Sequence, residues 1–218
     1  MDRRGWLIGA AAVLVGGHAG AGGDELPRVA LATLGGTLPE ADVAMVKTAL
    51  LAFYEVEVVV LPRADLPKQA YYPKRKRYRA EKLLDFLTER APKSAHRVLG
   101  ITAVDISTSK PPHEDWGVIG LANMGNTACV ISSFRCKRLA RNAEHARQRF
   151  GKVAVHELGH TFGLPHCPTK DCLMQDAKGS VLTSDREYDL CTRCRQMLIR
   201  RGYGLSGGTP PWPEPKPK

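Results

Sequence analysis

The chain has 218 residues, a formal charge of +10 and a hydrophobic fraction of 43%. This length fits one domain or two small ones, and the composition excludes a wholly disordered protein. The chain has no apolar run of the ~18 residues that a membrane-spanning helix needs, and its six cysteines are too few for a disulfide scaffold.

The first 21 residues have the pattern of a secretory signal peptide. Arg3 and Arg4 precede a short apolar stretch at residues 6–15, and residues 19–21 are small enough for cleavage. An uncleaved membrane anchor is the alternative, but the apolar stretch is short and rich in glycine. The paired arginines also resemble a weak twin-arginine signal, which exports proteins that are already folded. We therefore expect an exported protein, periplasmic or extracellular.

The remainder of the chain predicts strands that alternate with helices. Strand patterns occur at residues 28–34, 56–61, 98–106, 118–122 and 129–132. Helical periodicity predicts helices over residues 38–54, 79–90 and 143–162, with Asn142 as a plausible N-cap of the last one. This order predicts an α/β (α+β) fold, with a mixed sheet packed by helices, as a single domain over residues 26–204. The proline-rich residues 205–218 predict a disordered tail.

The last predicted helix leads into an H-E-x-x-H-x-x-G-x-x-H sequence that runs from His156 to His166. Residues four apart project from one face of a helix, so His156 and His160 can share one zinc ion. Glu157 follows the first of them and can reach water at the metal without binding the metal itself. Gly163 suits a left-handed turn that returns His166 as the third ligand. Three protein ligands leave one position for water, which is the arrangement of catalytic zinc sites.

Two close cysteine pairs follow this motif, first Cys167 and Cys172, then Cys191 and Cys194. Pairs at these spacings indicate a structural zinc site built from four thiolates. A capping box at residues 184–187 predicts a helix that places the second pair three residues apart on one face. Two disulfides are the alternative, because an exported protein meets an oxidising compartment.

The string from His156 to Cys194 resembles the archaemetzincin branch of the metzincin metalloproteases. That branch combines the extended zinc helix with a Cys after the third His, a downstream Cys-x-Met and a final Cys-x-x-Cys, and this chain has every element. The resemblance implies a metzincin-like fold with catalytic zinc on the three histidines and Glu157 as general base. It also implies a second zinc on the four cysteines, and Met174 as the Met-turn residue beneath the site.

These residues predict an exported zinc metallopeptidase with two zinc ions, one catalytic and one structural. Zinc lowers the pKa of its bound water, and Glu157 takes the proton as that water attacks a peptide carbonyl. A zinc protein that binds a peptide or partner without turnover is the alternative, although a pure binder needs no base such as Glu157. We expect a peptide or protein substrate, no nucleic acid, no membrane insertion after signal removal, and a monomer.

Two further features have structural interpretations. The densest basic run, residues 73–79, is interpreted as a solvated loop that leads into a helix, because no nucleic-acid-binding fold is recognisable. Cys129 and Cys136 would lie over ~20 Å apart and on opposite faces of one straight strand, so a disulfide between them needs a turn. We expect a buried thiol at Cys129 and leave the state of Cys136 open.

Overall fold

The computed structural model describes residues 25–214, so the expected signal peptide at residues 1–21 lies outside the described part. The main sheet has five strands in the order β2-β1-β5-β9-β8, of which only β8, at one edge, is antiparallel to its neighbour. Its strands are β1 (Arg28–Leu34), β2 (Glu57–Val60), β5 (Arg97–Thr102), β8 (Gly120–Ala122) and β9 (Ala128–Ser132).

A smaller sheet has the strand order β3-β4-β6-β7. Its strands are β3 (Tyr71–Tyr72), β4 (Arg77–Arg79), β6 (Ile106–Lys110) and β7 (His113–Val118). Two short 3-10 helices, η1 (Lys68–Ala70) and η2 (Pro73–Arg75), flank β3. The basic run at residues 73–79 therefore forms η2 and β4 and leads into a helix, α2.

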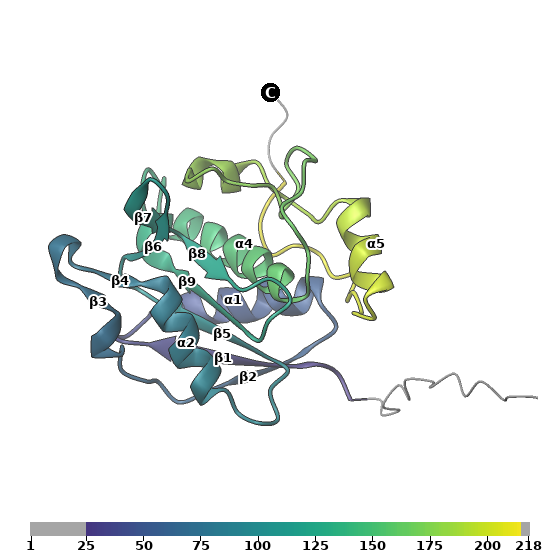
Figure 1. Cartoon of the computed structure of the whole chain (residues 1–218). Helices are drawn as coiled ribbons and strands as arrows, with labels where there is room; N and C mark the ends of the chain where they lie inside the picture. Colours follow the sequence, from purple (N-terminus) through teal and green to yellow (C-terminus); the bar gives the residue numbers. More distant parts are fainter. Residues whose placement is uncertain (1–24, 215–218) are drawn as a thin grey trace, which may run out of the picture.

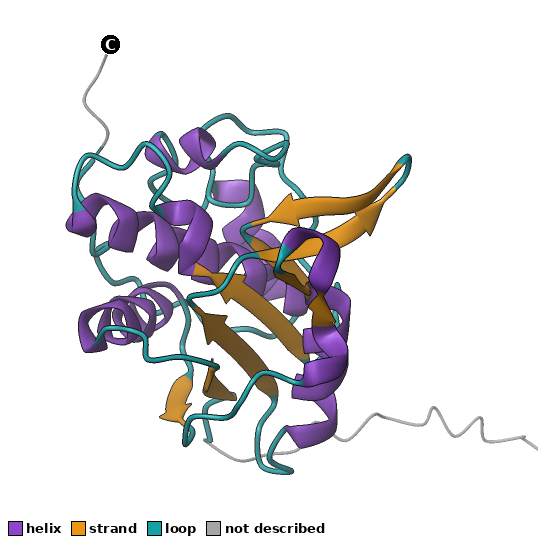
Figure 2. Ribbon diagram, turned by 90° about the vertical axis from the view of Figure 1, so that its left-hand side faces the viewer, coloured by secondary structure: helices purple, strands orange, loops and turns teal. Residues whose placement is uncertain are grey.

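Helices cover both faces of the main sheet (Figures 1 and 2). One face packs against α1 (Glu40–Phe53) and α4 (Ala143–Thr161), and the other against α2 (Ala80–Arg90). The shorter helices are α3 (Ser133–Cys136), η3 (Val181–Asp185) and α5 (Thr192–Arg200). Within residues 25–214, no helix combines the length and the apolarity that crossing a membrane requires.

Strand β1 shows why the central strands read as continuous apolar runs. Val29 and Leu31 belong to the core beneath α1 and α4, whereas Ala30 and Leu34 belong to the core beneath α2. Successive side chains of a strand point to opposite faces, so a sheet covered on both faces needs apolar residues at every position. The expected α/β architecture is confirmed, and Asn142 caps α4 by accepting a hydrogen bond from the His145 N–H at 2.8 Å.

The predicted single strand over residues 98–106 is wrong, because the chain leaves the main sheet after Thr102. The Thr102 hydroxyl donates to the Leu34 carbonyl at 2.9 Å, and Asp105 then forms a bidentate pair with Arg135 at 2.7 and 3.1 Å. This pair lies where the chain turns toward Ile106, the first residue of β6 in the smaller sheet. A local apolar pattern carries no information about a partner 30 residues away.

The expected capping box at residues 184–187 is also wrong. Ser184 lies within η3, and α5 begins at Thr192 with Cys191 at its N-cap. The buried Lys152 amine of α4 donates to the main-chain carbonyls of Ser184 and Glu187, at 2.8 and 2.5 Å. These tertiary hydrogen bonds hold the segment against α4 and displace the local capping preference.

The expected disorder of the tail does not hold for the part that the structure describes. Trp212 is 4% exposed, stacks on Phe53 with 5.6 Å between ring centroids, and donates its indole N–H to the Tyr188 carbonyl. Ser206 donates to the carbonyl of Ala52 in α1. One large aromatic side chain is enough to dock a proline-rich segment, because burying it removes a large apolar area from water.

Candidate active site

Three histidines converge at the C-terminal end of α4. Their imidazole nitrogens lie within 4.8 Å of one another, and the Nε2 atoms of His156 and His160 are 3.0 Å apart. The Nδ1 atoms of these two rings face the carbonyls of Leu173 and Leu164, at 2.6 and 2.7 Å. A carbonyl only accepts hydrogen bonds, so each Nδ1 carries the proton and each Nε2 keeps a free lone pair.

Burial keeps the two helical imidazoles neutral. It lowers the pKa of His156 to about 3 and lowers the pKa of His160 as well. Neutral imidazole is the form that binds a metal ion. The three imidazoles and the free lone pairs therefore fit a zinc ion. The structure also brings together the three histidines that the sequence predicts as ligands.

The turn that returns His166 to the site depends on Gly163. Helix α4 ends at Thr161, and Gly163 has a φ of +87°, the left-handed conformation expected for it. A side chain at this position would be strained, and a Cβ would also lie 2.9 Å from the guanidinium of Arg201. The main chain then reverses through a hydrogen bond from the Leu164 N–H to the Gly159 carbonyl at 2.9 Å.

Glu157 lies in the same cavity as the histidines and is 8% exposed. Its carboxylate has no hydrogen-bond or ion-pair partner within residues 25–214. It lies so close to Gly120 of β8 that a Cβ on this glycine would be 2.5 Å from Oε1. Burial raises the pKa of Glu157 to about 8. A group whose pKa lies near neutrality exchanges protons readily at physiological pH.

Met174 is fully buried beneath α4. A Cβ added to Gly159, which lies between the two helical histidines, would come within 2.7 Å of the Met174 sulfur. The carbonyl of Met174 accepts a hydrogen bond from the Cys167 N–H at 2.7 Å. The residue thus occupies the place beneath the site that the Met-turn resemblance implies.

The four cysteines of the two close pairs form a second cluster beside the histidines, with all sulfurs within 4.8 Å of one another. The Cys167 and Cys191 sulfurs are 3.6 Å apart, and those of Cys172 and Cys194 are 3.8 Å apart. Tetrahedral zinc with bonds of ~2.3 Å places its sulfur ligands about 3.8 Å apart, whereas bonded disulfide sulfurs are ~2.05 Å apart. The hydrogen bond between Cys172 and Cys194 lowers the pKa of Cys172 below the usual thiol value, which favours a thiolate there.

The remaining two thiols lie elsewhere and are both buried. Cys129 is in β9 and Cys136 is in α3, and neither is bonded to another cysteine. Burial raises the pKa of both thiols, that of Cys136 to about 12. Protonated, enclosed thiols behave as small apolar side chains, which matches the expectation for Cys129 and answers the open question at Cys136.

Comparison with known proteins agrees with this geometry. Residues 45–200 match the sequence profile of peptidase family M54. The chain belongs to this family, the archaemetzincins. It is 37% identical to the archaemetzincin of Methanopyrus kandleri over 139 residues, 63% of this chain and 75% of that protein. It is 30% identical to the archaemetzincin of Halobacterium salinarum over 159 residues, 70% of this chain and 88% of that protein.

Solved archaemetzincin structures share the fold. The crystal structure of the Methanopyrus kandleri protein superposes with a TM-score of 0.69 at 33% identity, covering 81% of this chain and 95% of that one. The structure from Archaeoglobus fulgidus superposes with a TM-score of 0.66 at 29% identity, covering 78% and 99%. The chain is therefore a zinc metallopeptidase of the archaemetzincin family with the expected metzincin-like fold.

The archaemetzincin site opens into a cavity of about 370 Å³. Its walls come from the edge strand β8, from α4, and from the loop and η3 that follow Met174. The three histidines and Glu157 all line it. A substrate entering this cavity would meet the three imidazoles and the carboxylate at once.

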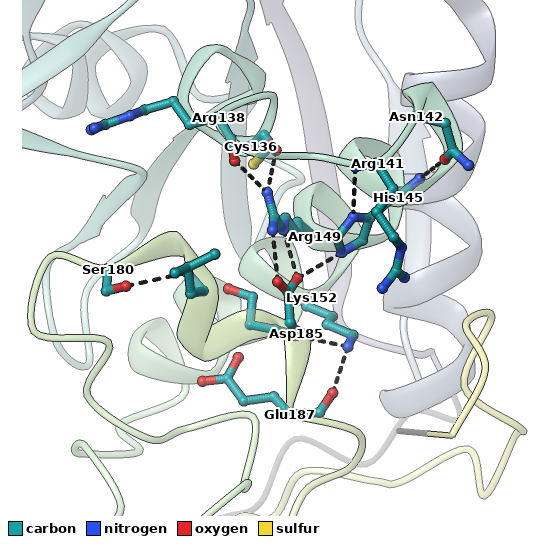
Figure 3. Close-up of polar contacts among 12 residues, drawn as sticks. Cys136, Arg138, Arg141, Asn142, His145, Arg149, Lys152, Ser180, Asp185 and Glu187 are labelled. Carbon is teal, nitrogen blue, oxygen red and sulfur yellow. Dashed lines mark hydrogen bonds and ion pairs between the residues drawn. The ribbon is translucent and has the colours of Figure 1, made fainter. Parts of the chain in front are cut away.

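A buried ion pair that the sequence did not reveal joins two walls of this cavity (Figure 3). Arg149 of α4 is 1% exposed and forms a bidentate pair with Asp185 of η3, with both N–O distances 2.6 Å. The third guanidinium nitrogen donates to the carbonyls of Cys136 and Arg138. His145 also contacts Asp185, at 2.7 Å. Arg149 precedes His156 by seven residues and shares its helix face, which was the one available signal.

This network yields a stability prediction for Asp185→Asn. We expect the substitution to lower the free energy of unfolding by about 3–5 kcal/mol, because it leaves the buried Arg149 charge uncompensated. Denaturant unfolding of the zinc-loaded protein measures the change. Glu144→Gln is the matched control, since Glu144 forms an exposed pair on the same helix and its loss is expected to cost under ~1 kcal/mol. Equal losses in the two variants would contradict a structural role for the buried pair.

Proposed function

We propose that this archaemetzincin hydrolyses peptide bonds with a catalytic zinc held by His156, His160 and His166, and with Glu157 as the general base. The observation that carries the proposal is the convergence of three imidazoles and one unpaired carboxylate on a single cavity. Zinc bound there supplies the Lewis acid that activates water and polarises a carbonyl.

The residues of the chain supply the remaining chemistry. Glu157 accepts a proton from the attacking water and passes it to the nitrogen of the leaving group. Because its carboxylate has no competing partner within the described residues, it is free to exchange that proton. Met174 packs under the helix between the two histidines. The carbonyls of Leu173 and Leu164 orient the two imidazole rings.

The edge strand β8 offers a binding mode for a peptide. It pairs with β9 on one side and lines the cavity with the other. An extended peptide can add to such an edge through main-chain hydrogen bonds. Strand β8 begins at Gly120, which lies beside Glu157. Gly125, just after the strand, donates to the carbonyl of His160, which is further along α4. Strand β8 and α4 therefore run in the same direction. A substrate paired antiparallel to β8 therefore directs its carboxyl-terminal side toward the N-terminal end of α4.

We also propose a structural zinc on Cys167, Cys172, Cys191 and Cys194. The sulfur separations of 3.6 and 3.8 Å support a tetrahedral metal site over two disulfides. This metal would bond the loop that carries His166 to helix α5. It would thereby stabilise the position of the third histidine without contacting the substrate.

Metal content and peptide hydrolysis test these assignments together. We expect two zinc ions per chain, four cluster thiols that react only after denaturation with a chelator, and hydrolysis that chelation abolishes and added zinc restores. One zinc with four oxidised cysteines would replace the structural metal by disulfides. Zinc-loaded protein that binds peptides from a mixed library but cleaves none would instead support the non-catalytic binding protein.

We further infer that the protein is exported. Support comes from the basic and apolar pattern of residues 1–21 and the small residues at positions 19–21. N-terminal sequencing of the protein recovered from the medium or periplasm is expected to begin after residue 21. Recovery of only the uncut chain in the membrane fraction would support an anchor.

A further inference from the structure

The active-site cavity continues past the histidines along α4 toward the start of the helix. Val153, one turn before His156, lines this extension. Val181 and Ser184 of η3 and then Glu187 form its other wall. The extension is therefore lined by two valines, one serine and one carboxylate.

The side chain of Glu187 has no partner of its own. The residue is 4% exposed, and within residues 25–214 no hydrogen bond or ion pair involves its carboxylate. The buried Lys152 amine donates to the main-chain carbonyl of Glu187 instead, at 2.5 Å. Figure 3 shows the Glu187 carboxylate pointing away from that amine. An unpaired acid this deeply buried is costly, and burial raises its pKa to about 8.

The nearby cations of the chain are committed to other groups. Arg149 is paired with Asp185, and Arg135 is paired with Asp105. Lys152 donates to the carbonyls of Ser184 and Glu187. Arg138 also lines the cavity, but it is exposed and forms no ion pair with Glu187. Lys152 and Arg186 act on Glu187 electrostatically and lower its pKa, but neither forms an ion pair with its carboxylate, so a cation that enters the cavity can supply a direct partner.

We propose that Glu187 is a specificity residue that receives a lysine or arginine side chain of the substrate. The peptide orientation along β8 assigns this side chain to the residue on the carboxyl side of the scissile bond, so the proposal rests on the proposed function. Val153 and Val181 would pack against the aliphatic stem of the substrate side chain, and Glu187 would pair with its charged end. A site built around a buried charged group discriminates strongly against analogues that leave the group unpaired.

The test uses peptides that differ only at the residue after the scissile bond, which is lysine, acetyl-lysine, leucine or glutamate. We expect the zinc-loaded wild type to cleave the lysine peptide with a kcat/KM at least about tenfold above the acetyl-lysine and leucine peptides. Glu187→Gln is expected to lose this preference, so that the ratio of kcat/KM for the lysine peptide to kcat/KM for the leucine peptide falls at least about tenfold. Glu89→Gln, an exposed control on α2, is expected to retain the preference.

Two results would overturn the specificity assignment while leaving hydrolysis intact. One is equal cleavage of lysine and acetyl-lysine peptides by the wild type, a comparison that does not depend on any variant folding. The other is an unchanged preference in well-folded Glu187→Gln.

A binding arm separates this inference from the proposed function. Fluorescent lysine and leucine peptides are titrated into the zinc-loaded Glu157→Gln variant with and without Glu187→Gln. Selective binding of the lysine peptide that Glu187→Gln abolishes would support the specificity assignment even if the wild type cleaved nothing, and the proposed hydrolysis alone would then fail. Equal binding of both peptides would overturn the assignment.

Discussion

Glu157→Gln is expected to lower kcat/KM for peptide hydrolysis by about 10²- to 10⁴-fold, the range for loss of a general base. Glutamine keeps nearly the shape of the side chain beside Gly120, but it cannot accept and return a proton. Steady-state kinetics on a fluorogenic peptide measures the loss. Because Glu157 is not one of the three imidazole donors, zinc content is expected to stay at the wild-type value.

Glu144→Gln serves as the control for Glu157→Gln, since it removes an exposed carboxylate from the same helix. Its kinetics are expected to match those of the wild type. Activity retained in Glu157→Gln would show that another group is the base. Activity lost together with zinc would show that the variant disturbed the metal site and would leave the base assignment unsupported.

Cys191→Ser is expected to lower the free energy of unfolding by several kcal/mol, since binding of a structural zinc contributes about 10–16 kcal/mol in small zinc-binding peptides. Cys191 Sγ lies 3.6 Å from Cys167 Sγ, and Cys167 follows His166 directly. Denaturant unfolding of the zinc-loaded wild type and variant measures the difference. The folded fraction of the variant is expected to keep most of its hydrolytic activity, because the cysteine cluster does not line the cavity.

The origin of the Cys191→Ser effect is tested by repeating the unfolding with both proteins under chelator. If the cluster binds zinc, the difference between wild type and variant should largely disappear, since neither protein then has the metal. If the cysteines form disulfides, the difference should persist under chelator and disappear under reductant. A well-folded variant without activity would contradict a structural role for this cluster.

Helix α4 carries the proposed catalytic residues and also residues that stabilise the fold of this archaemetzincin. One face of the helix carries His156 and His160, the residue Val153 on the wall of the cavity, and Arg149 in its buried pair with Asp185. The Arg149 pair and the two hydrogen bonds of Lys152 hold η3 and Glu187 against the helix. Changes in this anchoring are therefore expected to affect both folding and the shape of the cavity.

The sequence by itself determined the features that depend on short spacing. His156 and His160 share a helix face because helical geometry places residues four apart together, and Gly163 adopts a positive φ because only glycine does so without strain. Helix α2 and strand β1 lie where their periodicity predicts them. The close spacing within each of the two cysteine pairs likewise predicts a four-cysteine metal site.

Only the tertiary structure decided the features that depend on distant partners. Arg149 and Asp185 are 36 residues apart, and no local period encodes their pairing. The break between β5 and β6, the loss of the expected capping box at residues 184–187, and the docking of Trp212 all follow from contacts of the same kind. The unpaired carboxylate of Glu187 became visible in the same way, because burial and the absence of a partner are properties of the packed chain. Local periodicity fixes which face a side chain occupies, but the group it meets there depends on how the elements pack.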